Sequence, residues 1–240
     1  MLVGVDGCRA GWLAITLDDD TWRADLFSTI GDLWNALHDA SLILLDMPIG
    51  LPSEDTPIRE CDYVARKLLS PFRQSSVFPP PTRAAIKAET YPQACAINQR
   101  LTGSRFTVQT WNIVPKIREI DTLLLESVAA RSRIRESHPE VAFWVLAGGR
   151  PMWYPKRKKI GQAERLACLR ARFAPTDAIF ERIKIDFPRR EVAPDDIIDA
   201  LALVVMAAGE GPLLSIPVMP EFDERGLPME MVYRQLVFRN

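Results

Sequence analysis

The chain has 240 residues, which is enough for one large domain or two small ones with a well-formed core. Apolar residues make up 48% of the sequence and charged residues 25%, as is usual for a soluble globular protein, and the longest apolar stretch is too short to cross a bilayer. The net charge at pH 7 is −1, so the chain lacks the overall positive charge that marks a general nucleic-acid-binding protein.

Three short apolar segments at the start of the chain are predicted to form antiparallel strands. They cover residues 2–6, 12–17 and 22–27, and the connections between them are short. The segment 29–40 follows with apolar side chains at helical spacing, which predicts a helix. The continuous apolar run 42–45 then predicts a buried parallel strand.

The segment from residue 53 to about 130 is polar and rich in proline, and we expect an insertion of helices and loops over one end of the sheet. Apolar spacing predicts helices at 57–69, 89–101 and 114–131. We therefore expect residues 1–240 to form a single domain of the α/β class that carries this insertion.

The remainder of the chain returns to strong secondary-structure patterns. A strand is predicted at 132–138, and helices are predicted at 139–147, 161–173 and 194–211. The last of these helices is apolar on nearly every side, which indicates that it is buried. The final thirty residues carry weak strand signals and many prolines.

The four cysteines are far apart in the sequence and form no C-x-x-C pair. With only two histidines in the chain, a zinc site is not favoured. We interpret the cysteines as free thiols of a cytoplasmic protein, because no signal peptide pattern supports export. A pair of disulfides stays open as the alternative.

Two aspartates stand where predicted neighbouring strands end. Asp6 ends the first strand and Asp46 ends the fourth, and each is followed by residues that turn the chain. Ligands of α/β proteins bind beyond the carboxyl ends of parallel strands, so these two side chains are expected to converge. Close carboxylates need a cation or a proton between them, and oxygen ligands favour Mg²⁺ or Mn²⁺. For either aspartate alone, a turn-forming role is the simpler interpretation.

The late apolar helix supplies further acids. Asp199 is unusual because it lies among apolar residues, where an unpaired carboxylate is unfavourable. Asp196 lies three residues earlier and shares its face, although Asp195 and Asp196 are also suited to cap the start of the helix. Glu136 ends the predicted strand 132–138, and helix-start chemistry is an equally good explanation for it.

The order of these elements and several motifs together resemble an uncharacterised family of predicted ribonuclease-H-like nucleases, domain of unknown function number 429. The motifs run along the whole chain: GVDGCRAGW (4–12), DMPIGLP (46–52), RECDYVAR (59–66), SSVFPPPTR (75–83), PKIREID (115–121), ESHPEVAF (136–143) and DDIIDALA (195–202). The resemblance implies a ribonuclease-H-like mixed sheet, with three antiparallel strands followed by parallel strands, flanked by helices.

The resemblance also implies a function, namely hydrolysis of phosphodiester bonds by two divalent cations, Mg²⁺ or Mn²⁺. Asp6 would bridge the two metals, Asp46, Asp196 and Asp199 would complete their coordination, and Glu136 would be a further ligand or orient a water. Nucleic acid or a nucleotide would be the partner, and no membrane partner is expected. Basic side chains expected to hold the substrate are Arg9, Arg59, Arg66, Arg83, Lys116 and Lys156.

Two alternatives remain open at this stage. The basic run 154–159 is equally well explained as a solvated loop. The whole chain could also be a non-catalytic module that binds a nucleotide or nucleic acid on a ribonuclease-H-like or actin-like scaffold.

Overall fold

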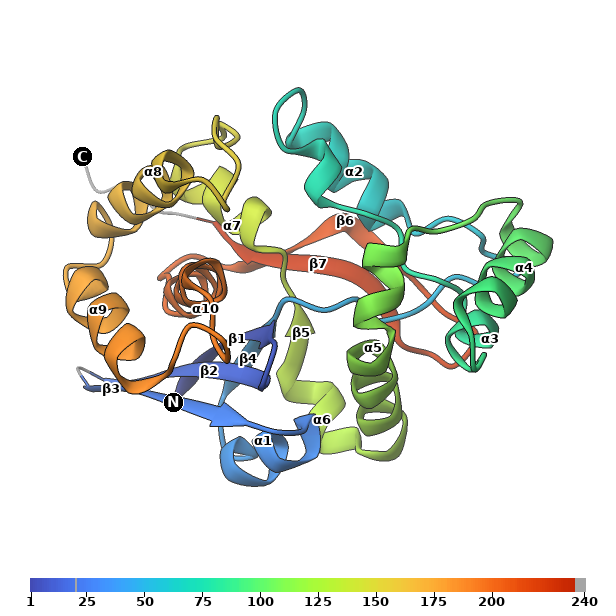
Figure 1. Cartoon of the computed structure of the whole chain (residues 1–240), viewed down its shortest axis with the longest axis horizontal. Helices are drawn as coiled ribbons and strands as arrows, with labels where there is room; N and C mark the ends of the chain where they lie inside the picture. The colour runs from blue at the N-terminus through green and yellow to red at the C-terminus, as the bar shows by residue number, and fades with distance from the viewer. Residues whose placement is uncertain (20, 236–240) are drawn as a thin grey trace.

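The computed structural model describes residues 1–19 and 21–235, and it is built around a mixed five-stranded sheet (Figure 1). The strands lie in the order β3-β2-β1-β4-β5, with β2 antiparallel to β1 and β3, and with β1, β4 and β5 parallel to one another. Their bounds are β1 Leu2–Cys8, β2 Gly11–Asp18, β3 Thr21–Phe27, β4 Leu42–Leu45 and β5 Ile134–Glu136. The predicted α/β class, with three antiparallel strands and then parallel ones, is confirmed.

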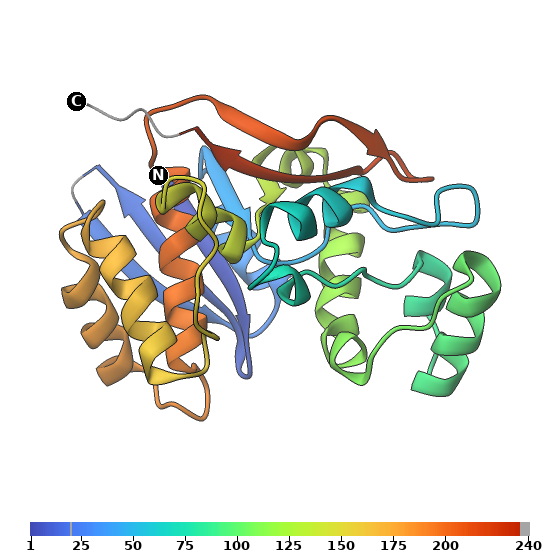
Figure 2. The ribbon, with the colours of Figure 1, turned by 90° about the horizontal axis from the view of Figure 1, so that it is seen from above.

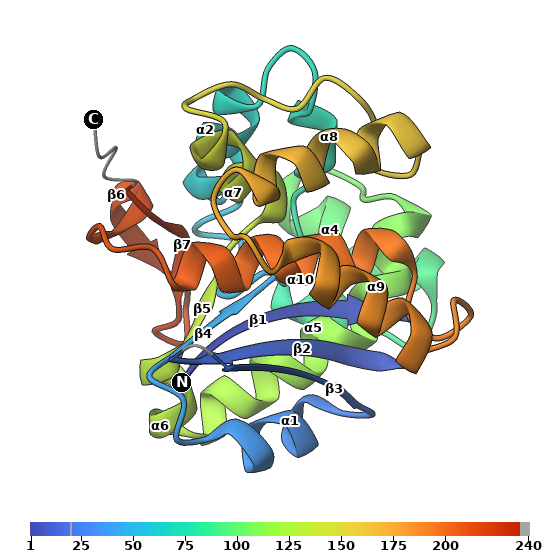
Figure 3. The ribbon, with the colours of Figure 1, turned by 90° about the vertical axis from the view of Figure 1, so that its left-hand side faces the viewer.

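Helices cover both faces of this sheet (Figure 3). Their bounds are α1 Ile30–Leu37, α2 Glu60–Leu68, α3 Arg83–Ile86, α4 Tyr91–Thr102, α5 Val108–Glu126, α6 Val128–Arg133, α7 Pro139–Leu146, α8 Lys159–Arg170, α9 Thr176–Asp186 and α10 Pro194–Ala207, with a 3₁₀ turn, η1, at Gln74–Ser76. One core cluster joins the sheet to α7, α8, α9 and α10, and a second joins the opposite face to α1, α5 and α6. The sheet is therefore the middle layer of three.

Helix α10 lies directly on β1, and Gly4 is the residue that permits this contact. A Cβ atom at Gly4 would lie 2.2 Å from the Val204 nitrogen and 2.4 Å from the Ala200 oxygen, both of them backbone atoms of α10. Side chains are therefore excluded at this position, and the two backbones meet. The contact brings the α10 residue next to Ala200, which is Asp199, close to the strand that carries Asp6.

Several predicted boundaries were wrong for identifiable reasons. The helix predicted at 114–131 begins at Val108, where the Thr107 side chain accepts a hydrogen bond from the Thr110 nitrogen, and it breaks at Ser127, whose backbone is extended. The Ser127 side chain then caps α6, so β5 is shorter than the predicted strand 132–138. Helix α9 was missed.

Two parts of the molecule lie outside the three layers. Helices α3 and α4 are set apart from the sheet and pack around a small core of their own, formed by Ala85, Ala94, Cys95 and Phe106 (Figure 2). Strands β6 (Leu213–Phe222) and β7 (Pro228–Arg234) form a separate antiparallel hairpin against α2, β5 and α10. Within the described ranges, no helix has the length and apolarity needed to span a membrane.

Candidate functional site

A cavity of about 540 Å³ opens at the carboxyl ends of β1, β4 and β5. Its other walls come from η1, the start of α10 and the segment between α7 and α8. All five acids singled out in the sequence line it: Asp6, Asp46, Glu136, Asp196 and Asp199. Folding therefore brings together side chains that lie up to 193 positions apart, counting from Asp6 to Asp199.

The strands fix the positions of Asp6 and Asp46. In the parallel pairing of β1 with β4, Val5 lies opposite Leu45, and the Asp46 nitrogen donates a hydrogen bond to the Val5 oxygen at 3.0 Å. Asp6 and Asp46 thus follow a matched pair of residues on adjacent strands. Because side chains alternate along a strand, Asp6 projects from the same face as Gly4, which is the face covered by α10.

Helix α10 contributes Asp196 and Asp199. Asp199 lies one turn into the helix and is only 1% exposed. Asp196 accepts a hydrogen bond from the Ala193 nitrogen at 2.8 Å, so one of its oxygens caps the helix, as the simpler interpretation expected. The two roles are compatible, because Asp196 also lines the cavity.

Three aspartates of this cavity have raised pKa values, namely Asp6, Asp46 and Asp196. Burial, together with the charges of Asp46 and Asp199, raises the pKa of Asp6 well above its ordinary value. Burial raises the pKa of Asp46 to about 7 and that of Asp196 to about 6, and nearby carboxylates add to both shifts. The site is therefore short of positive charge when all of its acids are ionised.

Lys156 supplies the positive charge that the cavity does contain. Its Nζ forms an ion pair with Asp199, although 38% of the lysine side chain stays exposed. Burial lowers the pKa of Lys156, but Asp199, Asp6 and Asp46 outweigh that effect and hold it above the ordinary value. Lys156 was predicted to bind substrate, whereas in the fold its ammonium lies against the predicted metal ligands.

The segment that carries Lys156 is anchored by a fully buried arginine. Arg165 of α8 donates hydrogen bonds to the Tyr154 and Gly161 oxygens at 3.0 and 2.9 Å. It also forms a buried ion pair with Glu140 of α7 at 2.5 Å. Arg165 thus holds the chain at Tyr154, before Lys156, and at Gly161, after it, and this fixes the position of Lys156 at the cavity.

The acids have the right chemistry for Mg²⁺ or Mn²⁺, since every donor is a carboxylate oxygen. In the described part of the chain, however, no group of three Asp, Glu, His or Cys side chains is arranged to hold an ion as it stands. One of these acids, Asp199, is instead paired with Lys156. A metal that bridged these carboxylates would have to displace the Lys156 ammonium.

Glu136 is engaged in a buried network on the cavity wall. Its carboxylate accepts a hydrogen bond from the Ile49 nitrogen at 2.6 Å and forms an ion pair with Arg59. Arg59 also pairs with Asp62 at 3.1 Å and donates to the Ile49 oxygen at 3.1 Å. Burial raises the pKa of Glu136 to about 8, and the Arg59 guanidinium opposes this rise. Arg59 and Glu136 therefore both line the cavity and form an ion pair with each other.

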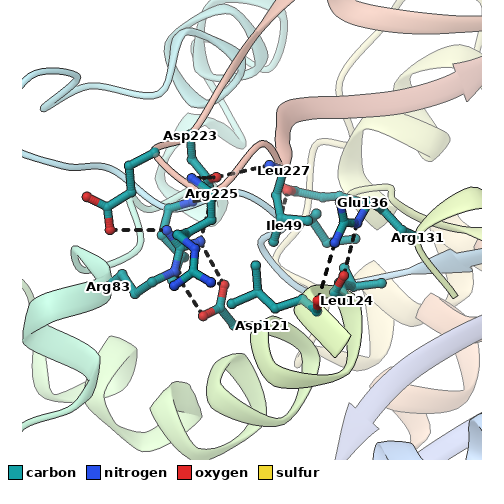
Figure 4. Close-up of polar contacts among 12 residues, drawn as sticks. Ile49, Arg83, Asp121, Leu124, Arg131, Glu136, Asp223, Arg225 and Leu227 are labelled. Atoms are coloured by element: carbon teal, nitrogen blue, oxygen red, sulfur yellow. Dashed lines mark hydrogen bonds and ion pairs between the residues drawn. The ribbon is translucent and has the colours of Figure 1, made fainter. Parts of the chain in front are cut away.

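Three other basic residues assigned to substrate are occupied within the fold. Arg83 pairs with Asp121, Asp223 and Glu224, which ties α3 to α5 and to the β6–β7 turn (Figure 4). Arg66 donates to the Val77 oxygen at 2.6 Å. Lys116 donates to the Gly11 oxygen at 2.6 Å and lies 4.5 Å from the centre of the Trp12 ring.

His138 also lines the cavity, although no role there was predicted for it from the sequence. Its Nδ1 accepts a hydrogen bond from the Glu140 nitrogen at 3.1 Å, which leaves Nε2 to donate to the Ser76 oxygen at 3.3 Å. Burial lowers the pKa of His138, in keeping with this neutral form. Its place before Pro139, close after the strand that ends in Glu136, was the signal that could have identified it.

Fold and site together define an α/β protein with an acidic cavity at the carboxyl ends of its parallel strands. A family model described as "Protein of unknown function (DUF429)" matches residues 4–221, and the chain belongs to this family. A search of curated proteins and a search of solved structures each found no match to this chain.

Proposed function

We propose that the protein is a ribonuclease-H-like hydrolase of phosphodiester bonds that works with Mg²⁺ or Mn²⁺. One observation carries the proposal: four aspartates from two adjacent parallel strands and a buried helix line a single cavity. Carboxylates held together away from water are unfavourable unless a cation or protons are bound among them. The strand order β3-β2-β1-β4-β5, with β2 antiparallel, supports the ribonuclease-H-like assignment.

In this proposal, Asp6, Asp46 and Asp199 hold the metal, and Asp196 offers the oxygen that does not cap α10. A bound divalent ion would lower the pKa of a coordinated water and neutralise charge on the phosphate. Lys156, once released from Asp199, would be free to contact a phosphate oxygen. The Arg59–Glu136 pair would keep the β4–α2 connection and the end of β5 in place on the cavity wall.

A second function is favoured by a different observation. Lys156 already compensates part of the carboxylate charge, so the cavity can exist without a metal. The protein would then be a non-catalytic module that binds a nucleotide or nucleic acid. In either case we propose a cytoplasmic location, which four cysteines without disulfide bonds support.

Manganese binding and nuclease activity test the proposal. Wild-type protein should bind Mn²⁺ in a calorimetric titration at pH 7.5 and should cleave at least one member of a panel of single-stranded and duplex DNA and RNA. Asp6→Asn should weaken Mn²⁺ binding at least 10-fold and abolish cleavage, with an unchanged circular dichroism spectrum. Asp39→Asn, at an exposed position outside the cavity, is the matched control.

Lys156→Gln separates the two functions. If Lys156 competes with a metal, its removal should tighten Mn²⁺ binding at least 10-fold. If the protein is a binding module, Lys156→Gln should create no metal site, and wild-type protein should neither bind Mn²⁺ nor cleave any substrate of the panel. Mn²⁺ binding that is equal in wild type and Asp6→Asn would refute the hydrolase proposal.

A further inference from the structure

A second cavity, of about 640 Å³, adjoins the acidic one and is lined by four arginines. We call it the arginine cavity, and its basic residues are Arg9, Arg157, Arg189 and Arg190. Gly7, Arg157, Asp195 and Asp196 line both cavities, so the two share a wall. A ligand that extends beyond the acidic cavity at this wall enters the arginine cavity.

The arginines come from segments distant in sequence that the fold ties together. Arg9 lies in the turn between β1 and β2, whereas Arg189 and Arg190 lie in the connection between α9 and α10. The Ala10 nitrogen donates to the Glu191 oxygen at 3.2 Å, which joins these two segments beside the cavity. The Glu191 nitrogen donates to the Pro188 oxygen at 2.8 Å and closes the second segment into a turn.

The guanidinium groups of the arginine cavity make few interactions with described residues of the chain. Arg9 and Arg189 are exposed and make no hydrogen bond or ion pair with any residue in the ranges 1–19 and 21–235. Arg157 and Arg190 have exposed side chains, and their only ion pairs are long, 3.9 Å to Asp195 and 3.7 Å to Glu191. Such pairs contribute little to stability, so these arginines remain available for an external anion.

We propose that the arginine cavity binds a phosphate group of the substrate next to the one held in the acidic cavity. This inference rests on the proposed function and narrows its substrate class to a polynucleotide strand. Guanidinium groups bind phosphate through two parallel hydrogen bonds, and two adjoining cavities suit a ligand whose phosphates repeat along a chain. The proposed phosphate site also gives a role to Arg189 and Arg190. These two arginines are distinct from the basic residues that hydrogen-bond or pair within the fold.

Oligonucleotide binding without any divalent ion tests the inference independently of catalysis. Fluorescence anisotropy would measure binding of a labelled single-stranded 10-mer in EDTA at several salt concentrations. The double variant Arg9→Gln/Arg189→Gln should bind at least 10-fold more weakly, and its salt slope should fall by about 1.4, because each lost phosphate contact on a single strand removes about 0.7. Arg23→Gln/Arg100→Gln, which changes charge equally outside both cavities, should bind like wild type.

Shorter ligands decide which phosphate compound the cavity recognises. Inorganic phosphate and a nucleoside diphosphate should compete with the 10-mer at least 100-fold less effectively than an unlabelled 10-mer does. If the diphosphate competes equally, the substrate is a small nucleotide and the polynucleotide inference is overturned. If the arginine variant binds the 10-mer like wild type, the phosphate site itself is refuted.

The two proposals fail in different ways. Normal Mn²⁺ binding, combined with oligonucleotide affinity that does not depend on Arg9 and Arg189, would refute only the arginine cavity. Loss of oligonucleotide affinity in the arginine variant, together with absent Mn²⁺ binding and absent cleavage, would refute the hydrolase but support the phosphate site.

Discussion

Asp46→Asn should stabilise the metal-free protein at alkaline pH. The folded protein keeps a proton on Asp46 up to about pH 7, whereas the unfolded chain loses it near the ordinary pKa of 3.8. The folded state therefore binds more protons between these values, and the contribution of Asp46 to stability falls as pH rises through this range and levels off above it. Asparagine cannot ionise, so the variant avoids this loss.

The size of the effect follows from the same pKa values. Each pKa unit corresponds to about 1.4 kcal/mol, so a pKa of about 7 in place of 3.8 corresponds to about 4 kcal/mol of unfolding free energy at pH 8. Asp46 is partly exposed, so solvent screening reduces the expected gain in unfolding free energy at pH 8 to about 2 kcal/mol. Near pH 4 the difference between the variant and wild type should vanish.

Urea unfolding in EDTA at pH 4, 6 and 8 measures this difference. Comparing Asp46→Asn with wild type at each pH removes the contributions of Asp196 and Glu136, whose pKa values are also raised. Asp39→Asn, at an exposed position outside the cavity, serves as the control for removing one carboxylate. A variant that is less stable than wild type at pH 8, or a difference from wild type that is the same at pH 4 and pH 8, would show that burial does not raise the pKa of the Asp46 carboxyl in the folded protein.

Other predictions concern the contacts that position the site. Gly4→Ala should destabilise the protein by about 3 kcal/mol or more in urea unfolding, because its Cβ would overlap the α10 backbone, and a stability equal to wild type would contradict the close approach. Gly31→Ala, on the first turn of α1 with ordinary space around it, should instead stabilise by about 0.5–1 kcal/mol. Arg165→Gln leaves the Glu140 carboxylate buried without its partner and should lower the unfolding free energy by about 3–5 kcal/mol, which Glu140→Gln in the same chain should partly restore.

The sequence was most informative where backbone geometry alone decides position. Asp6 and Asp46 could be placed together because each follows an apolar run that ends at the same edge of a parallel sheet. Asp199 could be placed near them because a carboxylate in an apolar helix requires a polar neighbour. These inferences need the periodicity of strands and helices but no knowledge of loops.

Side chains whose roles depend on tertiary contacts were predicted less well. Arg59, Arg66 and Arg83 were assigned to substrate because phosphate contacts require arginine or lysine, and the structure shows that each is also bonded to carboxylates or carbonyl oxygens of the fold. The position of Lys156 against Asp199 depends on how Arg165 anchors a segment without periodicity. The β6–β7 hairpin was recognised only as weak strand signals, because its prolines interrupt the usual alternation.

In the proposed hydrolase, the backbone contact at Gly4 would have a consequence for ion selectivity. Asp6 lies on β1 and Asp199 lies on α10, and these two elements are in backbone contact at Gly4 without intervening side chains. The distance between the backbones that carry the two aspartates therefore cannot change unless the central layer of the protein deforms. In the proposed hydrolase, an ion shared by this pair would have to match a gap set by core packing, and Mg²⁺ and Ca²⁺ differ in preferred oxygen distance by a few tenths of an ångström. Gly4 would thus determine which ion radius fits between Asp6 and Asp199, although Gly4 itself would not contact the ion.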